Sequence, residues 1–250
     1  MKALLLDVGN SRLKWGVLDS AAMRRTGHVT QSAIREQGLS TLARKLPRNV
    51  DAVIACNVAG KTFATDLAAF IRSHCGLDVQ FVQPVAKAFG VTNGYRQPQR
   101  LGADRWVAMI GARAWCASSC LVVDAGTAIT IDALDDDGQH LGGQILPGLQ
   151  LMASALAKNT GDLPNLGTRQ LNTAANGKIF AGSTAAAIAS GVSGAAAGAV
   201  ARALRAMRQK GFKPTVILTG GDALRIQSAL DEEAHFRPQL VLEGLARILE

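Results

Sequence analysis

Aromatic side chains are scarce in this sequence, since Phe, Trp and Tyr together make up 4% of its 250 residues. The formal net charge is +8, but no dense block of Lys and Arg is present, and few rings are available to stack on bases. A basic chain can bind nucleic acid, and it can equally attract anionic small molecules. We expect small anions and no nucleic acid, and a core built mainly from Ala, Leu, Val and Ile.

Cysteine is also sparse, and the four residues present show no spacing typical of a disulfide framework. The N-terminus enters a strand directly after Lys2, so we expect no signal peptide and a cytoplasmic protein. One uncharged stretch, Ile179 to Val200, is long enough to cross a bilayer, but it consists mostly of Ala, Gly, Ser and Thr. Its Gly194-x-x-x-Gly198 spacing permits close helix packing, so we expect a helix against a core or a partner subunit, and no membrane.

The stretch LLDVGNSRLKWGV at residues 5–17 reads as strand, tight polar turn and strand. Gly9 lets the backbone approach a ligand, while Asn10, Ser11 and the turn amides can donate to phosphate oxygens and Lys14 adds a cation. Asp7 would repel phosphate, so its place is explained if Mg²⁺ lies between them. The alternative is an ordinary hairpin with an aspartate at its turn.

The same pattern returns in VDAGTAITIDAL at residues 123–134. Asp124 corresponds to Asp7, Gly126 to Gly9 and Thr127 to Asn10. One Asp-x-Gly is a weak signal, but two between apolar strands, a domain apart, indicate a duplicated domain with two phosphate-facing hairpins.

Between and beyond the hairpins, strands alternate with helices, which favours α/β layering. We expect strands at 52–55, 79–82, 140–146 and 216–218, and helices at 40–46, 61–74, 106–115, 149–158, 184–204 and 240–249. Residues 159–176 are polar and are expected to form a loop. The acidic triplet Asp135 to Asp137 lies at the far end of its strand from Asp124, and we interpret it as a solvated hairpin turn.

The segment GADR at 102–105 opens the helix that includes Trp106. Asp104 either caps this helix or accepts a proton from an attacking hydroxyl, as a positioned carboxylate does in phosphoryl transfer. On the second interpretation, Arg105 binds substrate oxygens as a planar fork and Gly102 leaves room for the substrate.

With GADR, GGQILPG at 142–148 and LTGGDA at 218–223 in order, the chain resembles the type III pantothenate kinases of the acetate and sugar kinase, Hsp70 and actin superfamily. The resemblance covers essentially the whole chain. It implies ATP-dependent phosphorylation of pantothenate, the first step towards coenzyme A. It also implies two ribonuclease H-like α/β domains, about 1–117 and 118–250, with ATP in the cleft between them.

The resemblance further implies a homodimer, a monovalent cation (K⁺ or NH₄⁺) held by Asp124, and Mg²⁺ held by Asp7 through phosphate or water. Asp104 is then the catalytic base. The implied ATP and phosphate contacts are Asp7, Val8, Gly9, Asn10, Ser11, Arg12, Leu13, Lys14 and Thr127. The implied substrate contacts are Tyr95, Gly102, Ala103, Asp104, Arg105 and Thr184.

Two alternatives stay open. A sugar kinase of the same superfamily shares the hairpins, but the chain is short and GADR matches the pantothenate family. A non-catalytic relative that regulates transcription would suit the positive charge, although such a protein need not keep Asp7, Asp104, Asp124 and Thr127.

Overall fold

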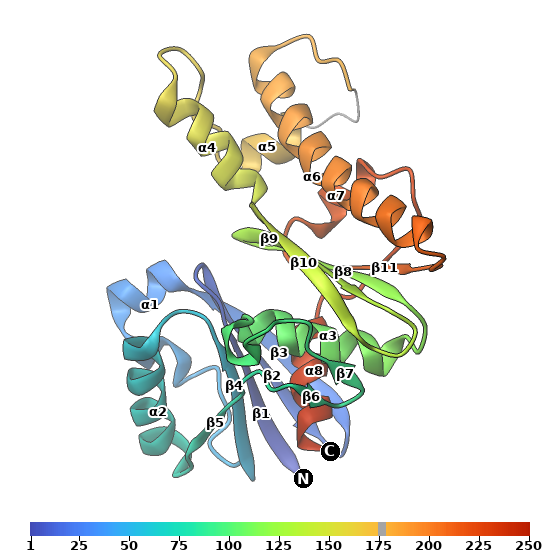
Figure 1. Cartoon of the computed structure of the whole chain (residues 1–250). Coiled ribbons are helices and arrows are strands. Elements are labelled where there is room, and N and C mark those ends of the chain that lie inside the picture. The colour runs from blue at the N-terminus through green and yellow to red at the C-terminus, as the bar shows by residue number, and fades with distance from the viewer. Residues whose placement is uncertain (175–178) are drawn as a thin grey trace. The chain divides into compact units, whose positions relative to one another are not determined.

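The protein is described by a computed structural model that covers residues 1–174 and 179–250 (Figure 1). It divides into two compact units. Unit 1 comprises Met1–Trp115 and Gln239–Glu250, and unit 2 comprises Cys116–Pro238. Each unit contains a five-stranded sheet that begins with an antiparallel meander and ends in parallel strands.

Unit 1 has the strand order β3-β2-β1-β4-β5. Its sheet is built from β1 (Lys2–Val8), β2 (Arg12–Asp19), β3 (Ala22–Thr30), β4 (Ala52–Asn57) and β5 (Val79–Phe81). Its helices are α1 (Gln31–Gln37), α2 (Lys61–Cys75), α3 (Ala103–Trp115) and α8 (Leu240–Leu249), with short 3-10 turns η1 (Leu39–Leu42) and η2 (Pro98–Arg100). A small hairpin of β6 (Lys87–Ala88) and β7 (Val91–Thr92) lies in the link before α3.

Alternate residues of β1 point to opposite faces of the sheet in unit 1. Leu4, Leu6 and Val8 lie in one apolar cluster with side chains of α1 and α2. α3 and α8 pack together and also contact β1 and β4, and Figure 1 shows them beside the sheet. The sheet is therefore covered by helices on both faces.

Unit 2 repeats the plan with the order β10-β9-β8-β11-β12. Its strands are β8 (Cys120–Ala125), β9 (Ala128–Leu134), β10 (His140–Pro147), β11 (Thr215–Thr219) and β12 (Ala234–Phe236). Its helices are α4 (Leu149–Asn159), α5 (Thr168–Ala174), α6 (Thr184–Gln209) and α7 (Ala223–Ser228). One apolar cluster joins Leu121, Val123 and Ala125 of β8 to the buried side of α6, which includes Val192 and Val200.

Among the described residues, α6 is the one helix that is long and apolar enough to span a membrane by length and composition, and a core helix passes the same test. Ten of its residues are buried in unit 2. Packing in the core of unit 2 therefore explains the apolar residues on that side of α6.

Helix α8 packs with unit 1, although the sequence-based division assigned all of 118–250 to the second domain. The contact is close because two glycines face each other's helix. A Cβ on Gly111 would lie 2.5 Å from the Leu240 carbonyl oxygen, and a Cβ on Gly244 would strike the Val107 carbonyl. The order of the elements along the chain does not by itself show that α8 packs with unit 1.

Most expected elements are present, and the differences lie in short or polar segments. The helix expected at 40–46 is wrong, because only η1 forms there, and α1 precedes it. The loop expected at 159–176 contains α5, while its residues 175–176 lie outside the described part. The acidic triplet is a hairpin turn as predicted, in which Asp135 Oδ1 accepts the Asp137 and Gln139 backbone N–H groups.

Candidate active site

The first hairpin turn is closed by its own backbone and by one buried side chain. The Gly9 N–H donates to the Arg12 carbonyl oxygen at 3.0 Å. Gln31, at the start of α1 and 5% exposed, donates its Nε2 to the Gly9 carbonyl oxygen at 2.9 Å. Its own N–H donates to the Ser11 carbonyl oxygen at 2.9 Å. Gln31 thus fixes the turn, and the sequence pattern did not single it out because nothing in the hairpin motif points to a residue so far along the chain.

The turn residues divide into buried and exposed groups. Val8 and Leu13 are 0% exposed as whole residues, so neither is open to a ligand in this structure. Asn10, Ser11 and Arg12 are exposed. This arrangement suits a phosphate-binding turn, in which backbone amides and short polar side chains are the donors.

Asp7 lies at the end of β1, beside one residue on each neighbouring strand. It pairs with Lys14 on β2 and with Cys56 on β4. The Lys14 Nζ is 3.9 Å from Asp7 Oδ2, and the Cys56 Sγ donates to Asp7 Oδ1 at 3.5 Å. The carboxylate, in a residue only 8% exposed, is therefore held on both oxygens.

Burial raises the pKa of Asp7 above its ordinary value, because a charge is costly away from water. The Lys14 ammonium lowers that pKa, the Asp104 charge raises it, and the Cys56 hydrogen bond lowers it. Burial also raises the pKa of the Cys56 thiol well above its usual range, and the charges of Asp7 and Asp104 add to this. Cys56 is therefore a protonated donor to Asp7, and Asp104 lies within electrostatic reach of both groups.

Asp104 lies in the first turn of α3. Its Oδ1 accepts the Arg105 backbone N–H at 2.8 Å. A Cβ on Gly102 would lie 2.6 Å from that Oδ1, so the glycine of GADR leaves space for the carboxylate. The sequence alone allowed a cap or a base, and the electrostatic influence of Asp104 on Asp7 is consistent with a role beyond the helix.

Arg105 is 5% exposed, and its Nη1 donates to the Tyr95 hydroxyl at 2.8 Å. Tyr95 belongs to the irregular link, which the buried Asn93 holds in place. Asn93 Oδ1 accepts the Tyr95 backbone N–H at 3.0 Å, and its Nδ2 donates to the carbonyl oxygens of Val85 and Pro98. The structure thus brings Tyr95 and Arg105 together as one hydrogen-bonded pair.

The second hairpin turn is packed against glycine-rich segments of unit 2. A Cβ on Gly148 would strike the Gly126 carbonyl, and the Gly148 N–H donates to the Thr127 carbonyl oxygen at 2.9 Å. A Cβ on Gly220, where φ is +92°, would meet Asp124 Oδ1. The motifs GGQILPG and LTGGDA therefore carry glycine at these two positions because the chain passes directly against the hairpin that holds Asp124 and Thr127.

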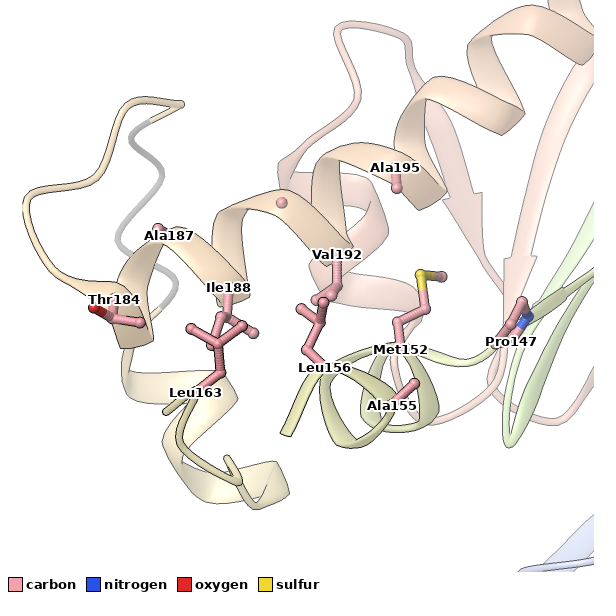
Figure 2. A pocket seen from close by; sticks show the side chains of 11 residues that line it. Pro147, Met152, Ala155, Leu156, Leu163, Thr184, Ala187, Ile188, Val192 and Ala195 are labelled. Atoms are coloured by element: carbon pink, nitrogen blue, oxygen red, sulfur yellow. The ribbon is translucent and has the colours of Figure 1, made fainter. Parts of the chain in front are cut away.

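Thr184 is the first residue of α6 and is exposed, whereas the preceding Ser183 caps the helix by accepting the Ala186 N–H at 3.3 Å. Thr184 also lines an open apolar pocket of about 550 Å³ between α4 and α6, with Met152, Leu156 and Ile188 (Figure 2). Its hydroxyl is not used for capping.

Within residues 1–174 and 179–250, no group of three or more His, Cys, Asp and Glu side chains is placed to hold a metal ion. Mg²⁺ delivered with a nucleotide needs no such group, since it is commonly held by one or two carboxylates and substrate phosphates. Asp7, with Asp104 near it, is the arrangement of that kind in unit 1.

Comparison with known proteins gives a consistent result. A family model described as type III pantothenate kinase matches residues 3–241. Type III pantothenate kinases of Azoarcus sp. (strain BH72) and Halorhodospira halophila are 39% and 40% identical to the chain, covering 98% and 97% of it and 89% and 95% of their own lengths.

Solved structures resemble the fold. A Campylobacter jejuni protein assigned to the Baf family of transcriptional activators has a TM-score of 0.60 at 21% identity, covering 98% of this chain and 96% of its own. A ROK family glucokinase from Streptomyces griseus, solved with glucose and AMPPNP, has a TM-score of 0.51 at 15% identity, covering 99% of each chain. The predicted fold class, two ribonuclease H-like domains of the actin-like ATPase type, is confirmed.

Proposed function

This chain belongs to the type III pantothenate kinase family, and we propose that it transfers a phosphoryl group from ATP to the alcohol of pantothenate. The product, 4′-phosphopantothenate, is the first intermediate towards coenzyme A. Family membership supports the substrates. The structural observation that carries the proposal is the carboxylate of Asp7 at the end of β1, with Lys14 at one oxygen, Cys56 at the other and Asp104 within electrostatic reach.

Each carboxylate has a separate task in this proposal. ATP bound with Mg²⁺ supplies the phosphoryl group. Asp7 carries the negative charge that attracts the metal, either through its water or through the phosphates, and the amides of the Gly9 turn donate to phosphate oxygens. Lys14 adds a cation beside them.

Asp104 orients the pantothenate hydroxyl and takes its proton. As the oxygen–phosphorus bond forms, the bond between the transferred phosphorus and ADP breaks, and the hydroxyl proton goes to the Asp104 carboxylate. Arg105, already fixed by Tyr95, presents its remaining N–H groups to the oxygens of pantothenate. Gly102, Ala103 and Thr184 complete the proposed substrate contacts, and Thr127 the phosphate contacts, on the strength of the resemblance.

We further propose that the active form is a homodimer joined through α6. Gly191, Gly194 and Gly198 lie on an exposed side of this helix, and a Cβ on any of them would meet no atom within 4 Å. The apolar pocket of Figure 2 lies beside it, and so does Ile179, whose carbonyl oxygen accepts the Ser190 hydroxyl at 3.0 Å. Ile179 and Phe180 are 82% and 92% exposed. A second copy of the same helix would cover these surfaces.

Light scattering tests the dimer. The wild type should show the dimer mass, and Gly194→Arg, which places a charge in open space on this side of α6, should give a folded monomer. Gly161→Arg, a change at a glycine in a loop with equally open surroundings, should stay dimeric. A monomer mass for an active wild-type sample would rule out this assembly.

The proposal also includes a cytoplasmic location, a monovalent cation (K⁺ or NH₄⁺) bound by Asp124, and no nucleic-acid or membrane partner. The regulator alternative was drawn from the positive charge of the chain, and the likeness to a transcriptional activator at 21% identity shows the fold alone. A gel-shift assay at low and high salt would reveal DNA binding, because phosphate contacts weaken steeply with salt.

The direct test of the proposed function is ADP release in a coupled assay with pantothenate and Mg-ATP, in KCl, NH₄Cl or choline chloride. We expect turnover that depends on pantothenate and rises with K⁺ or NH₄⁺. A folded protein that releases no ADP under any of these salts would overturn the kinase assignment.

A further inference from the structure

The aspartate of each hairpin is the middle residue of a row that crosses three neighbouring strands. In unit 1 the row is Cys56 on β4, Asp7 on β1 and Lys14 on β2. In unit 2 the corresponding strands are β11, β8 and β9, and the row is Thr219, Asp124 and Thr130. Residues paired in this way point to the same face of a sheet, so the three side chains of each row stand side by side.

The equivalence of Lys14 and Thr130 comes from strand pairing. In unit 1 the last pair before the turn is Val8 with Leu13, which leaves four residues, 9–12, in the turn. In unit 2 it is Ala125 with Ile129, which leaves three residues, 126–128. The second turn is one residue shorter, so the residue opposite Asp124 is Thr130, although a gap-free sequence alignment sets Lys14 against Ile131.

The two rows differ in how they can neutralise the aspartate. In unit 1 the Lys14 ammonium lies 3.9 Å from Asp7 Oδ2. In unit 2 no basic side chain occurs in the row, and the strand partners of Asp124 are two threonines, whose side chains carry hydroxyl groups. One of them, Thr219 Oγ1, belongs to a residue that is 1% exposed, and it has no hydrogen-bond partner among the described residues.

A buried hydroxyl without a partner is uncommon, because its desolvation is not compensated. A carboxylate flanked by hydroxyl oxygens suits a singly charged cation, since K⁺ is bound by oxygens that replace its hydration shell and NH₄⁺ donates N–H groups to the same atoms. Gly220 keeps the space beside Asp124 Oδ1 free of a side chain. The chain's own residues therefore fit the monovalent cation of the proposed function.

We propose that Thr219 and Thr130, together with Asp124, hold this cation, and that it takes in unit 2 the position that the Lys14 ammonium takes in unit 1. The proposal rests on the proposed function for the cation itself. It adds two binding residues, Thr219 and Thr130. It also adds an internal replacement, by which we mean that a cation bound from solution in unit 2 occupies the position that the Lys14 ammonium occupies in unit 1.

The first test measures cation binding by thermal stability, independently of turnover. Melting temperatures are recorded across a KCl series with choline chloride holding the ionic strength constant, in the presence of Mg-ADP. Thr219→Val keeps the shape of the side chain and removes the hydroxyl, so the KCl concentration for half-maximal stabilisation should rise about tenfold or more. Thr219→Ser, which keeps a hydroxyl, should stay near the wild type.

Ser119→Ala is the matched control. Ser119 is 0% exposed and its hydroxyl likewise has no partner among the described residues, but it precedes β8, at the opposite end of that strand from Asp124. Its loss should change the basal melting temperature without moving the KCl midpoint. If Thr219→Val kept the wild-type midpoint, or if Ser119→Ala moved it equally, Thr219 would not be a cation ligand.

The second test supplies the ammonium covalently. Thr130→Lys places in unit 2 the side chain that unit 1 has at the paired position, so both the K⁺-dependent stabilisation and the K⁺ dependence of ADP release should disappear, with turnover retained in choline chloride. Turnover that still required K⁺ would refute the internal replacement. Should Thr130→Lys not fold, the Thr219 series still decides the proposal.

Measurements on the wild type distinguish a failure of the proposed cation from a failure of the assignment of the two threonines. If wild-type protein is active but neither stabilised nor activated by KCl or NH₄Cl, the cation part of the proposed function fails, and this inference with it. If the wild type responds to K⁺ and the variants respond identically, only the assignment of the two threonines fails.

Discussion

Of the 27 Lys and Arg residues, 17 belong to unit 1 and 10 to unit 2, while the 19 Asp and Glu residues divide into 9 and 10. The formal net charge of +8 therefore arises entirely in unit 1, and unit 2 is neutral by composition. Both units nevertheless have the same strand order and the same Asp-x-Gly hairpin. The two units therefore share one strand order but differ in net charge.

This difference indicates how the units share the work. A positive domain raises the local concentration of anions, and both proposed substrates are anions. The aspartate of unit 1 has a lysine beside it and a second carboxylate, Asp104, within electrostatic reach. In the row of unit 2, the strand partners of Asp124 are two threonines, and the proposed cation from solution would bind there. Each prediction below tests one part of this contrast.

The largest effect is expected for Asp104, which gives unit 1 its proposed base. Asp104→Asn keeps the shape of the side chain but is a far weaker base, so kcat should fall by about 10²–10⁴-fold while ATP binding and the melting temperature stay nearly unchanged. If Asp104 acted only at the helix end, Asn would replace it with little loss. Both quantities are to be measured on the same variant.

Asp66→Asn is the control for Asp104, because Asp66 is an exposed aspartate on α2 of the same unit. It should leave both kcat and the melting temperature at wild-type values. A normal kcat for Asp104→Asn would leave unit 1 without a base and remove the main functional difference between the units.

The next effect compares the two hairpin aspartates. Asp7→Asn should weaken the use of Mg-ATP, seen as a shift of the Mg²⁺ activation curve, whereas Asp124→Asn should chiefly change the K⁺ curve. Identical responses of the two curves to both substitutions would mean that the two rows are not specialised.

Asp7→Asn should also raise the melting temperature of the ligand-free protein at neutral pH. The pKa of Asp7 is raised by burial, so the folded state holds this proton to higher pH than the unfolded state does. Stability is therefore lost as the pH rises from 3.8, the ordinary pKa of aspartate, through the folded pKa, and Asn removes this loss. The gain should be absent at a pH below 3.8, where Asp7 is protonated in both states.

How far the sequence could lead is clearest at these two hairpins. The repeated Asp-x-Gly between apolar strands predicted both turns, because period-two alternation and glycine mark hairpins strongly. The row partners could not be predicted, since the second turn is shorter by one residue and strand register depends on turn geometry. The sequence therefore indicated Lys14 as a phosphate contact but gave no reason to examine Thr130 or Thr219.

Other limits have the same physical origin, since long-range contacts leave little trace in local pattern. Gln31 holds the first turn from a distant helix, and α8 returns to unit 1 through close glycine contacts. Helix α5 is short and polar, so it shows no apolar periodicity. GADR was recognised as a motif, but its sequence left the choice between cap and base open and gave no sign that the charge of Asp104 acts on Asp7.

A moderate effect on kcat/KM is expected when unit 1 loses the lysine beside its hairpin aspartate. Lys14→Met removes the ammonium that lowers the pKa of Asp7, so that pKa should rise further and the acid limb of the kcat/KM profile for ATP should move to higher pH. At neutral pH the loss should be about 10²-fold, the size usual for removing one group that stabilises the transferring charge. Arg48→Met, at an exposed position of unit 1, is the control for net charge.

If Arg48→Met lowered kcat/KM as much as Lys14→Met, the overall field of unit 1 would explain the effect, and the row would not. If Lys14→Met left the acid limb in place, the proposed control of Asp7 by Lys14 would be wrong.

The smallest effect concerns Cys56, the thiol that takes the place of Thr219 in unit 1. Its Sγ donates to Asp7 Oδ1, and among the influences on the pKa of Asp7 it is weaker than burial, Lys14 and Asp104. Cys56→Ala should therefore raise that pKa slightly and lower kcat/KM at neutral pH by less than about tenfold, the range of a single hydrogen bond. Cys56→Ser supplies a stronger donor and should lower the pKa below the wild-type value.

The order of the acid limbs, with Ser lowest, Cys intermediate and Ala highest, distinguishes a hydrogen bond from packing. A purely structural role predicts instead that both variants lose stability and that the acid limb does not move. Cys120→Ala, at a cysteine equally buried in β8 of unit 2, shows how much stability the loss of a buried thiol costs by itself. If the three acid limbs coincided, Cys56 would be a packing residue, and the row of unit 1 would act through Lys14 alone.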